Sequence, residues 1–278
     1  MERIQVDLHM HTVASDGTQT PQALLDEVIE KDIKIFSVTD HDSVDSIAEM
    51  MVLAKKTDRV FIPGVEISAM YDDKEIHLLT YGLLPDHEML MGILKRNRAI
   101  REAFNIKIIE HIKKVKHFVS LEAYLNYERD PSWGGWKAEN YLRDIGAIHH
   151  LGDLFAMLHD MEEQMVFPLA QDILPKLKSA GATVFLAHPP AYCGGELVPE
   201  SMLDELTEMG IDGIECFSPY YKLGDQSDYY VSYCKTHDLM ISCGSDYHGS
   251  FIATRHMGHP NKTLNELKID QLLKNTSL

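Results

Sequence analysis

Imidazole and carboxylate side chains are closely spaced in two segments near opposite ends of the chain. The segment "VDLHMHTVASDGT" carries Asp7, His9 and His11 at every second position, with Asp16 shortly after them. The segment "GSDYHG" repeats the two-residue spacing of aspartate and histidine. Side chains two residues apart on a β-strand share one face. A buried face of this composition is costly unless it is compensated, and coordinated metal ions are the natural compensation.

Polar residues of the same kinds follow other apolar segments, at the points where β-strands should end. Each alone has an ordinary explanation, since a lone histidine is usually a core or surface residue and an aspartate often forms a turn or caps a helix. Nine candidate ligands at six successive strand ends are hard to explain in this way, and together they predict a metal site. No cysteine is among them, so Zn, Mn and Fe are all compatible. The nine residues are His9, His11, Asp16, His41, Glu66, His77, His188, Asp246 and His248.

Short apolar segments alternate with amphipathic segments over most of the chain, and these elements must position the candidate ligands. The alternation predicts an α/β fold with a parallel sheet that is closed or nearly closed into a barrel. In such barrels the chemistry gathers at the C-terminal ends of the strands, which is where the candidate ligands occur. The expected strands are residues 3–11, 33–42, 60–68, 75–82, 182–190, 211–219 and 239–248. The expected helices are residues 20–32, 44–56, 173–181, 199–210 and 227–238.

Residues 85–168 interrupt this alternation. They contain a long helical segment with a basic face over residues 94–115, followed by shorter helical pieces and the turn "SWGGW". We therefore expect a barrel core made of residues 1–84 and 169–278, with residues 85–168 forming an all-helical insertion.

Composition and charge disfavour several classes of protein. The 278 residues are 45% hydrophobic and 25% charged, as in ordinary globular proteins. No apolar run approaches ~18 residues and the first residues lack the pattern of a secretory signal, so we expect a cytoplasmic protein without a membrane span. The net charge of -17 disfavours a face that binds duplex nucleic acid. A small phosphorylated ligand remains compatible, with bound metals as the local positive charge.

The motifs "DLHMHT", "TDHD", "GVEIS" followed by "EIHLLTYG", "LAHP" and "GSDYHG" occur in this order. In this respect the chain resembles the PHP (polymerase and histidinol phosphatase) family of metal-dependent phosphoesterases, over about residues 1–84 and 170–250. The helical insertion is similar to that of the family branch that acts on nucleoside phosphates. The resemblance implies a distorted (β/α)7 barrel that holds two or three divalent metals.

The resemblance also implies how the ligands are divided among the metals. His9, His11, Glu66 and Asp246 would hold the first metal. Glu66 would bridge to a second metal, which His77 and His188 would also hold. Asp16, His41 and His248 would hold a third. Some family members have histidine in place of Asp16, so the carboxylate here favours Mn or Fe over Zn.

Further roles follow from the same motifs and from the chemistry of such sites. Asp7 and Asp40 would orient ligand imidazoles from behind. Two metals that share Glu66 can also share a water, whose lowered pKa gives a bridging hydroxide that attacks phosphorus. We expect Glu66, Asp246 and His248 to be the catalytic residues. An acid for the leaving group is not evident, because His256 and His259 are more simply explained as surface residues.

Substrate recognition is expected in the insertion. Arg98 and Arg101 lie three apart on one helical face, and Lys137 follows in "WGGWKAENYL"; these could bind phosphate or form a solvated face. The nucleoside-phosphate branch often has a second arginine where this chain has Phe104, and a Gly-Arg-Pro-His-like segment where this chain has "WGGWKAENYL". Trp133 and Trp136 could stack on a nucleobase or anchor the insertion.

The leading functional hypothesis is metal-dependent hydrolysis of a small phosphorylated metabolite or nucleotide, for example a nucleoside 3′,5′-bisphosphate or a short oligonucleotide. A histidinol-phosphate phosphatase is an alternative that the barrel motifs permit and the insertion disfavours. A C–N hydrolase of the amidohydrolase type would more commonly use a carboxylated lysine than Glu66 as the bridge. A non-catalytic PHP module is a third alternative, disfavoured because every motif ligand is present.

Overall fold

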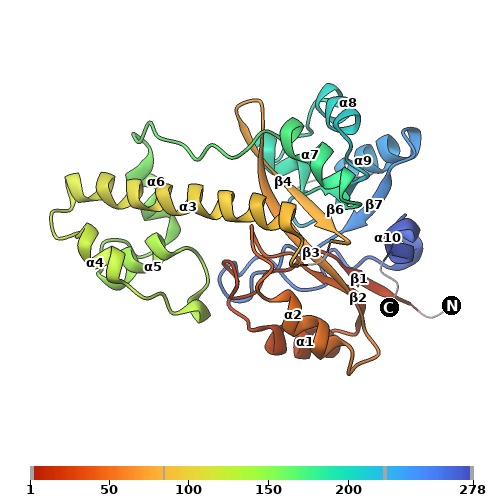
Figure 1. Ribbon diagram of the computed structural model, residues 1–278, viewed down its shortest axis with the longest axis horizontal. Coiled ribbons are helices and arrows are strands. Elements are labelled where there is room, and N and C mark those ends of the chain that lie inside the picture. The colour runs from red at the N-terminus through yellow and green to blue at the C-terminus, as the bar shows by residue number, and fades with distance from the viewer. Residues whose placement is uncertain (1–2, 84, 222–223, 276–278) are drawn as a thin grey trace.

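Seven strands form one mixed sheet within the part of the chain that the structure describes, and they are arranged in sequence order (Figure 1). This computed structural model describes residues 3–83, 85–221 and 224–275. The expected strands are present but several are shorter than predicted. They are β1 (Gln5–Asp7), β2 (Ile33–Val38), β3 (Val60–Tyr71), β4 (Lys74–Tyr81), β5 (Thr183–Leu186), β6 (Gly213–Phe217) and β7 (Met240–Cys243).

The expectation of a parallel sheet is wrong at β4. The pairs β1–β2, β2–β3, β5–β6 and β6–β7 are parallel, whereas β4 runs antiparallel to both β3 and β5. Asp72 and Asp73 alone separate β3 from β4. Two residues can close a hairpin but cannot form the crossover that a parallel pair requires.

The two outer strands meet just beyond their ends. The amide of Leu8 donates a hydrogen bond to the carbonyl of Cys243 (3.1 Å), and the amide of His11 donates to the carbonyl of Tyr247 (2.8 Å). These bonds link the segments that follow β1 and β7, although the two strands form no ladder within the described residues. Closure into a barrel therefore stays a prediction.

Helices cover the sheet on both sides, with α1 and α2 below it and α7, α8 and α9 above it in Figure 1. Helix α1 begins where predicted, because Thr20 accepts a hydrogen bond from the amide of Ala23 and Pro21 occupies the first turn. No helix among the described residues is long and apolar enough to span a membrane. The helices are α1 (Pro21–Glu30), α2 (Ile47–Ala54), α7 (Ala170–Ser179), α8 (Glu200–Met209), α9 (Gly224–Thr236) and α10 (Asp270–Asn275), with 3-10 turns η2 (Pro189–Cys193) and η3 (Leu264–Glu266).

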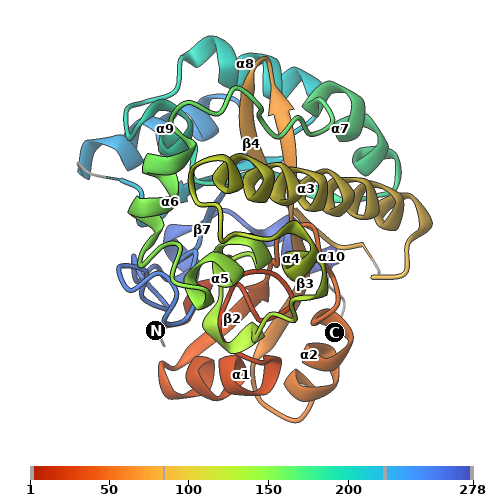
Figure 2. The ribbon, with the colours of Figure 1, turned by 90° about the vertical axis from the view of Figure 1, so that its left-hand side faces the viewer.

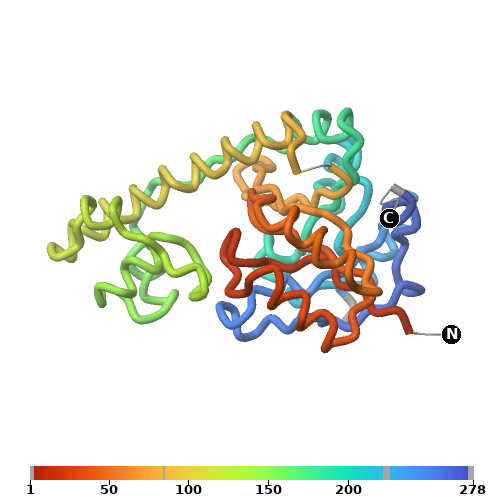
Figure 3. Tube along the Cα trace, turned by 60° about the horizontal axis from the view of Figure 1, so that its bottom comes forward, coloured from red at the N-terminus to blue at the C-terminus, as the bar shows by residue number. Residues whose placement is uncertain are grey.

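Between β4 and α7 the chain is helical. Helix α3 (Glu88–Val115) extends away from the sheet and carries a group of short helices to one side (Figures 1 and 3). We call α4–α6 and the far half of α3 the helical lobe; Figure 2 shows it in front of the core. Its buried side chains, among them Ile109, Tyr124 and Leu142, form an apolar cluster separate from those around the sheet. The short elements are α4 (Leu121–Asn126), η1 (Pro131–Trp133), α5 (Lys137–Asp144) and α6 (Leu151–Leu158).

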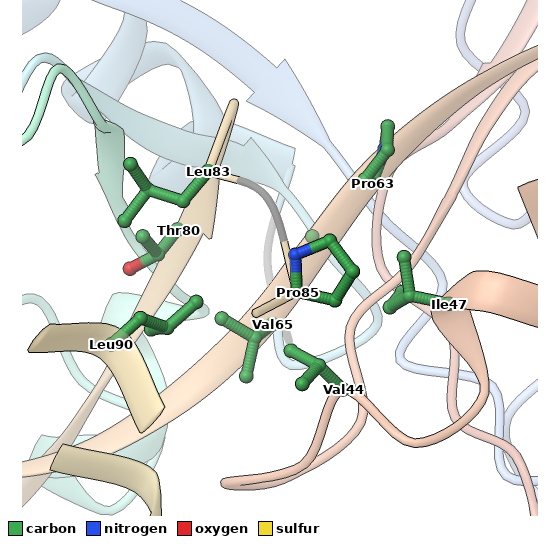
Figure 4. A pocket seen from close by; sticks show the side chains of 9 residues that line it. Val44, Ile47, Pro63, Val65, Thr80, Leu83, Pro85 and Leu90 are labelled. Carbon is green, nitrogen blue, oxygen red and sulfur yellow. The ribbon is translucent and has the colours of Figure 1, made fainter. Parts of the chain in front are cut away.

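An apolar void lies between the sheet and the helices near the start of α3 (Figure 4). Val65 of β3, Ile47 of α2 and Leu90 of α3 line it, and its volume is about 10 Å³. That is close to the smallest space that holds one water, and its lining is apolar apart from Thr80. This void is a packing defect of the core rather than a ligand site.

The near half of α3 is fixed to the core by a buried polar network. Asn97 is fully buried, and its amide group donates to Asp42 Oδ1 and to the carbonyl of Ser68, both at 2.7 Å. Arg101 donates to Asp42 Oδ2 (3.3 Å) and to Ser68 Oγ (2.9 Å). Burial raises the pKa of Asp42, which these donors partly offset. The network therefore fixes the direction in which α3 leaves the sheet.

We expect Asn97→Ala to lower the free energy of unfolding by about 1–3 kcal/mol, because the carboxylate of Asp42 and the carbonyl of Ser68 lose a buried donor. Urea denaturation followed by circular dichroism measures the change. Asn126→Ala is the matched control, since Asn126 is exposed and should change stability by less than about 0.5 kcal/mol. Equal effects of the two substitutions would contradict the anchoring role of Asn97.

Candidate metal centre

His9 and His11 lie in extended chain just beyond β1, and their side chains share one face as predicted. Leu8 and Met10 point to the opposite side and are fully buried in apolar clusters. The Nε2 atom of His9 lies 3.1 Å from Glu66 and 3.3 Å from Asp246, and that of His11 lies 3.3 and 3.2 Å from the same two carboxylates. The structure thus brings together the four residues expected at the first metal.

Glu66 lies between this group and a second one. Its Oε1 atom is 3.0 Å from His77 Nδ1 and 3.0 Å from His188 Nε2. Its Oε2 atom is 3.2 Å from His41 Nδ1. A carboxylate placed in this way could bridge two cations.

The expectation that Glu66 and His77 end their strands is wrong. The parallel pairing of β3 with β2 stops at Pro63, but β3 continues to Tyr71 while paired with β4. Both residues therefore lie inside a hairpin that extends beyond the parallel strands. The extension brings them to the level of the segments that follow β1, β2 and β7, as the bridge between His41 and Glu66 shows.

A third group gathers around Asp16. Its carboxylate oxygens lie 3.6 Å from His11 Nδ1, 3.5 Å from His248 Nε2 and 3.9 Å from His41 Nε2. Asp16 follows β1, His41 follows β2 and His248 follows β7, so three separate segments supply this group.

The residues present fit divalent metals. Nitrogen ligands about 2.05 Å from a tetrahedral ion lie about 3.3 Å apart, which is close to the spacings found here. Within the described residues, three groups have ligand atoms that all lie within 4.8 Å of one another. Several of these atoms are buried without any hydrogen-bond partner, which a coordinated ion would supply. They are His9 Nε2, His11 Nε2, His41 Nδ1, His77 Nδ1 and Glu66 Oε2.

The electrostatics of the cluster depend on close pairing of opposite charges. Burial alone would raise the pKa of Glu66, but the imidazoles of His41, His9 and His77 hold it well below its usual range. Burial alone would lower the pKa of His11, but Asp246 and Glu66 outweigh it and raise the pKa to about 10. His77 behaves in the same way, because Glu66 raises its pKa to about 10 against the effect of burial. Protons would therefore compete with metals for these ligands.

Two of the candidate ligands have unusual backbone conformations. His188 has φ 24° and Asp246 has φ 50°, in the left-handed region that side chains other than glycine rarely adopt. Such conformations cost on the order of 1–3 kcal/mol each and persist only where the surroundings impose them. Here they turn both side chains into the cluster immediately after β5 and β7.

Asp7 and Asp40 differ from their expected role, since both are buried but contact backbone and hydroxyl groups rather than imidazoles. Asp7 accepts hydrogen bonds from the amides of Ser245 (2.9 Å) and Gly258 (2.8 Å). Asp40 accepts from the amide and hydroxyl of Thr12 and from the hydroxyls of Ser15 and Ser46. The two carboxylates fix the loops that carry the ligands instead of the ligand rings.

Glu215 is the supporting residue that sequence reasoning missed. It is fully buried in β6, with Oε1 3.0 Å from His9 Nδ1 and Oε2 accepting from the amide of His188 (2.8 Å). Gly244 makes this approach possible, because a Cβ there would overlap His9 and Glu215. The sequence feature that could have revealed Glu215 is its position as a glutamate inside the apolar run "GIECF".

Tyr220 and Arg255 also adjoin the cluster and were not predicted. The hydroxyl of Tyr220 donates to Asp246 Oδ2 (3.0 Å), and its ring lies 4.7 Å from the ring of His188 at an interplanar angle of 40°. The guanidinium of Arg255 lies 3.9 Å from the centre of the Tyr220 ring, with Nε 3.5 Å from Asp246. His256 and His259, in contrast, are exposed, and no hydrogen bond or ion pair joins their rings to the cluster within the described residues.

The candidate substrate contacts Arg98, Arg101 and Lys137 line one cavity of about 240 Å³, together with His41 and Trp136. Arg101 stacks on Trp136 at 4.2 Å, and its Nε is buried without a hydrogen-bond partner. Arg98 donates to the carbonyl of Asp42 and Lys137 donates to that of Leu125, so part of their donor capacity is used within the protein. Trp133 is exposed. We call this space the basic cavity.

Arg129 joins the helical lobe to the loop that carries Asp16. Its guanidinium donates to the carbonyls of Ser15 (2.9 Å), Val13 (3.1 Å) and Gly135. The amide of Gly135 in turn donates to the carbonyl of Asp16 (2.8 Å). The sequence does not indicate the role of Arg129, because its partners are backbone carbonyls, and every residue type has one.

Comparison with known proteins decides the family. The family model described as PHP domain matches residues 7–174, which is more than half of the chain. This chain is a PHP protein. The resemblance inferred from the five motifs is thereby confirmed.

Relatives of this PHP protein act on phosphoester bonds. A 5′-3′ exoribonuclease of Haemophilus influenzae is 27% identical over 250 residues, covering 87% of this chain and 89% of the relative. A 3′,5′-nucleoside bisphosphate phosphatase of Chromobacterium violaceum is 25% identical over 259 residues, covering 91% and 90%. The predicted enzyme class, a hydrolase of phosphoester bonds, is confirmed at this level.

The fold agrees with that of a solved structure. A protein of Bifidobacterium adolescentis, assigned as a metal-dependent phosphoesterase, superposes with a TM-score of 0.76 at 23% identity, over 99% of this chain and 96% of that one. At this identity the likeness concerns the fold alone. The mixed seven-stranded α/β arrangement is therefore shared with a PHP-like structure.

We expect Mn²⁺ binding to the metal-free PHP protein at pH 7 to release about three protons, because the pKa of His9 is raised well above its usual value, those of His11 and His77 are raised to about 10, and all three rings must be neutral to coordinate. Affinity should rise with pH up to about that value, since fewer protons then compete. Calorimetry in buffers of different ionisation enthalpy measures the release. A binding enthalpy that is independent of the buffer would contradict the assigned charge state.

We expect Arg129→Ala to weaken metal binding at the Asp16 group about tenfold, because residues that orient ligands typically contribute 10–100-fold. Titration with Mn²⁺ followed by paramagnetic resonance of the free ion measures affinity and stoichiometry. Arg96→Ala is the control, since Arg96 is exposed on α3. Identical titrations of the two variants would show that the Arg129 contacts do not position Asp16.

Proposed function

We propose that this PHP protein hydrolyses phosphate esters of small metabolites or nucleotides with the help of two or three divalent metals. The observation that carries the proposal is the shared carboxylate of Glu66, which lies within 3.3 Å of imidazoles from all three ligand groups. Bound metals at such a bridge would supply an activated water and neutralise charge on the phosphate.

The proposed ligand sets are those that the resemblance implies. The spatial groups differ in the second set, because His41 lies with Glu66 and His77 there and His188 is in none of the three. Glu66 and Asp246 join His9 and His11 in the first. In the second, Glu66 is joined by His77 and His188. The third consists of Asp16, His41 and His248. We propose Mn or Fe as the metals, because the third group contains a carboxylate where some family members have histidine.

Other residues prepare these ligands. Glu215 would accept the Nδ1 proton of His9 and so keep Nε2 free to coordinate. Tyr220 and Arg255 both face Oδ2 of Asp246, which leaves Oδ1 directed at His9 and His11. His9 is thus held in the orientation that coordination needs, and once its ring is neutral Glu215 favours the tautomer with Nε2 free.

The substrate is proposed from charge and position. The basic cavity adjoins His41 and supplies Arg98, Arg101 and Lys137, in a protein whose net charge is otherwise -17. An anionic ester with its phosphate at the cluster would be favoured there. The names of the relatives, an exoribonuclease and a bisphosphate phosphatase, support nucleotides or short oligonucleotides as candidates. We also propose that the sheet forms a distorted barrel and that residues 85–168 are an insertion into it. The proposed location of the protein is the cytoplasm.

We expect the Mn²⁺-loaded protein to hydrolyse at least one of nucleoside 3′,5′-bisphosphates, mononucleotides, short RNA, cyclic phosphates and histidinol phosphate. The monoesters would release phosphate, whereas short RNA and cyclic phosphates would give monoester products that chromatography detects. His9→Ala and Asp246→Ala should each lose bound metal and at least 100-fold in activity, since both residues contribute to the first group. His159→Ala is the control, because His159 is exposed on the surface. Phosphate release and elemental analysis are the measurements. Full turnover by metal-depleted His9→Ala would overturn the proposal.

A further inference from the structure

A second cavity, of about 300 Å³, lies against the basic cavity and is almost entirely apolar. We call it the apolar cavity. Helix α6 and helix α3 form its walls, and the side chains that matter here are Phe104, Ile108, Leu151, Leu154, Phe155 and Leu158. Phe155 is 67% exposed, so the cavity opens to solvent.

Aromatic residues connect the apolar cavity with the metal cluster. The ring of Trp136 lies 6.0 Å from the ring of His41, and that of Phe251 lies 6.4 Å from the ring of His248. Both aromatic residues also line the apolar cavity. His41 and His248 belong to the Asp16 group, so the cavity begins on that side of the cluster.

The two cavities share Arg101, Asn105 and Trp136. An ester with its phosphate at the cluster would therefore meet the cationic groups of the basic cavity and, next to them, a space that is largely apolar. The only carboxylate among the residues that line the apolar cavity is Glu139, which is 3% exposed and forms an ion pair with Arg143. A group rich in hydroxyls would find few partners in this space and would lose hydrogen bonds to water on entering it.

We propose that the apolar cavity binds the alcohol part of a phosphate monoester and selects for an aromatic ring or a branched aliphatic group. This inference rests on the proposed phosphoesterase function. In the reaction, the bond between phosphorus and the oxygen of that alcohol breaks. Water provides the new oxygen on phosphorus and the proton on the released alcohol. The cavity takes no part in these bond changes; it determines which alcohols are held at the cluster.

The test compares two phosphate monoesters of simple alcohols, benzyl phosphate and glycerol phosphate, with the Mn²⁺-loaded full chain. We expect kcat/KM to be at least tenfold higher for benzyl phosphate, because the ring leaves water on binding. Phe155→Ala should reduce this preference about fivefold, mainly through KM, and Phe155→Asp should reduce it further. Phe118→Ala should leave the preference unchanged, because Phe118 is 60% exposed and does not line the cavity.

Equal kcat/KM values for the two esters, or an equal loss for both in Phe155→Ala, would overturn the inference. Calorimetry with benzylphosphonate, which has no phosphorus–oxygen ester bond to hydrolyse, measures binding in the cavity without any cleavage. It therefore tests the cavity separately from the proposed phosphoesterase function. Binding that weakens in Phe155→Ala supports the cavity even if no ester is cleaved, and absence of cleavage then counts against the proposed function alone. Phosphate release without benzylphosphonate binding overturns the cavity alone.

Discussion

One buried carboxylate determines the arrangement of the whole functional end of this protein. Among the described residues, Glu66 lies within 3.3 Å of five imidazoles, those of His9, His11, His41, His77 and His188. So many imidazoles cannot all be charged in a largely buried space, nor can they remain neutral and unpaired without cost. The pKa values express this conflict, since that of His41 is pushed well below its usual range by burial while His11 and His77 are raised. Divalent cations relieve the conflict in a single step, because they bind neutral imidazoles and need carboxylates.

The position of Glu66 depends on the one antiparallel strand of the described sheet, β4, which pairs with β3. A residue in the middle of a strand is normally surrounded by sheet on both sides. β3 leaves β2 after Pro63 and continues as a hairpin with β4, so the middle of β3 lies beyond the ends of the parallel strands. Glu66 can then face loops from both halves of the sheet. The antiparallel strand is therefore a requirement of the site, and the short turn at Asp72 and Asp73 is what imposes it.

The cluster of candidate ligands could be anticipated from the sequence because these residue types are improbable in their surroundings. A histidine pair such as His9 and His11 inside an apolar segment has few explanations, and alternation along an extended chain gives its orientation correctly even though β1 itself ends at Asp7. Glu215 has the same character, but a single glutamate in "GIECF" carries no spacing that ties it to His9, 206 residues away. The sequence suggests that Asp40 orients an imidazole, because the next residue, His41, is a candidate ligand. Its actual partners, Thr12, Ser15 and Ser46, are hydroxyl residues whose partners are decided only by tertiary structure.

The helical lobe contributes to the site through backbone as much as through side chains. Arg129 and Gly135 bind carbonyls of the loop after β1, and Phe251, which follows His248, packs against Gly134 and Gly135. Trp136 follows these glycines directly and reaches His41. The segment "WGGW" is thus held on both sides by loops that carry ligands of the Asp16 group. Its glycines are required because a Cβ at Gly134 would meet Phe251 and the carbonyl of Asp16. A segment that departs from the family pattern therefore adjoins the Asp16 group directly.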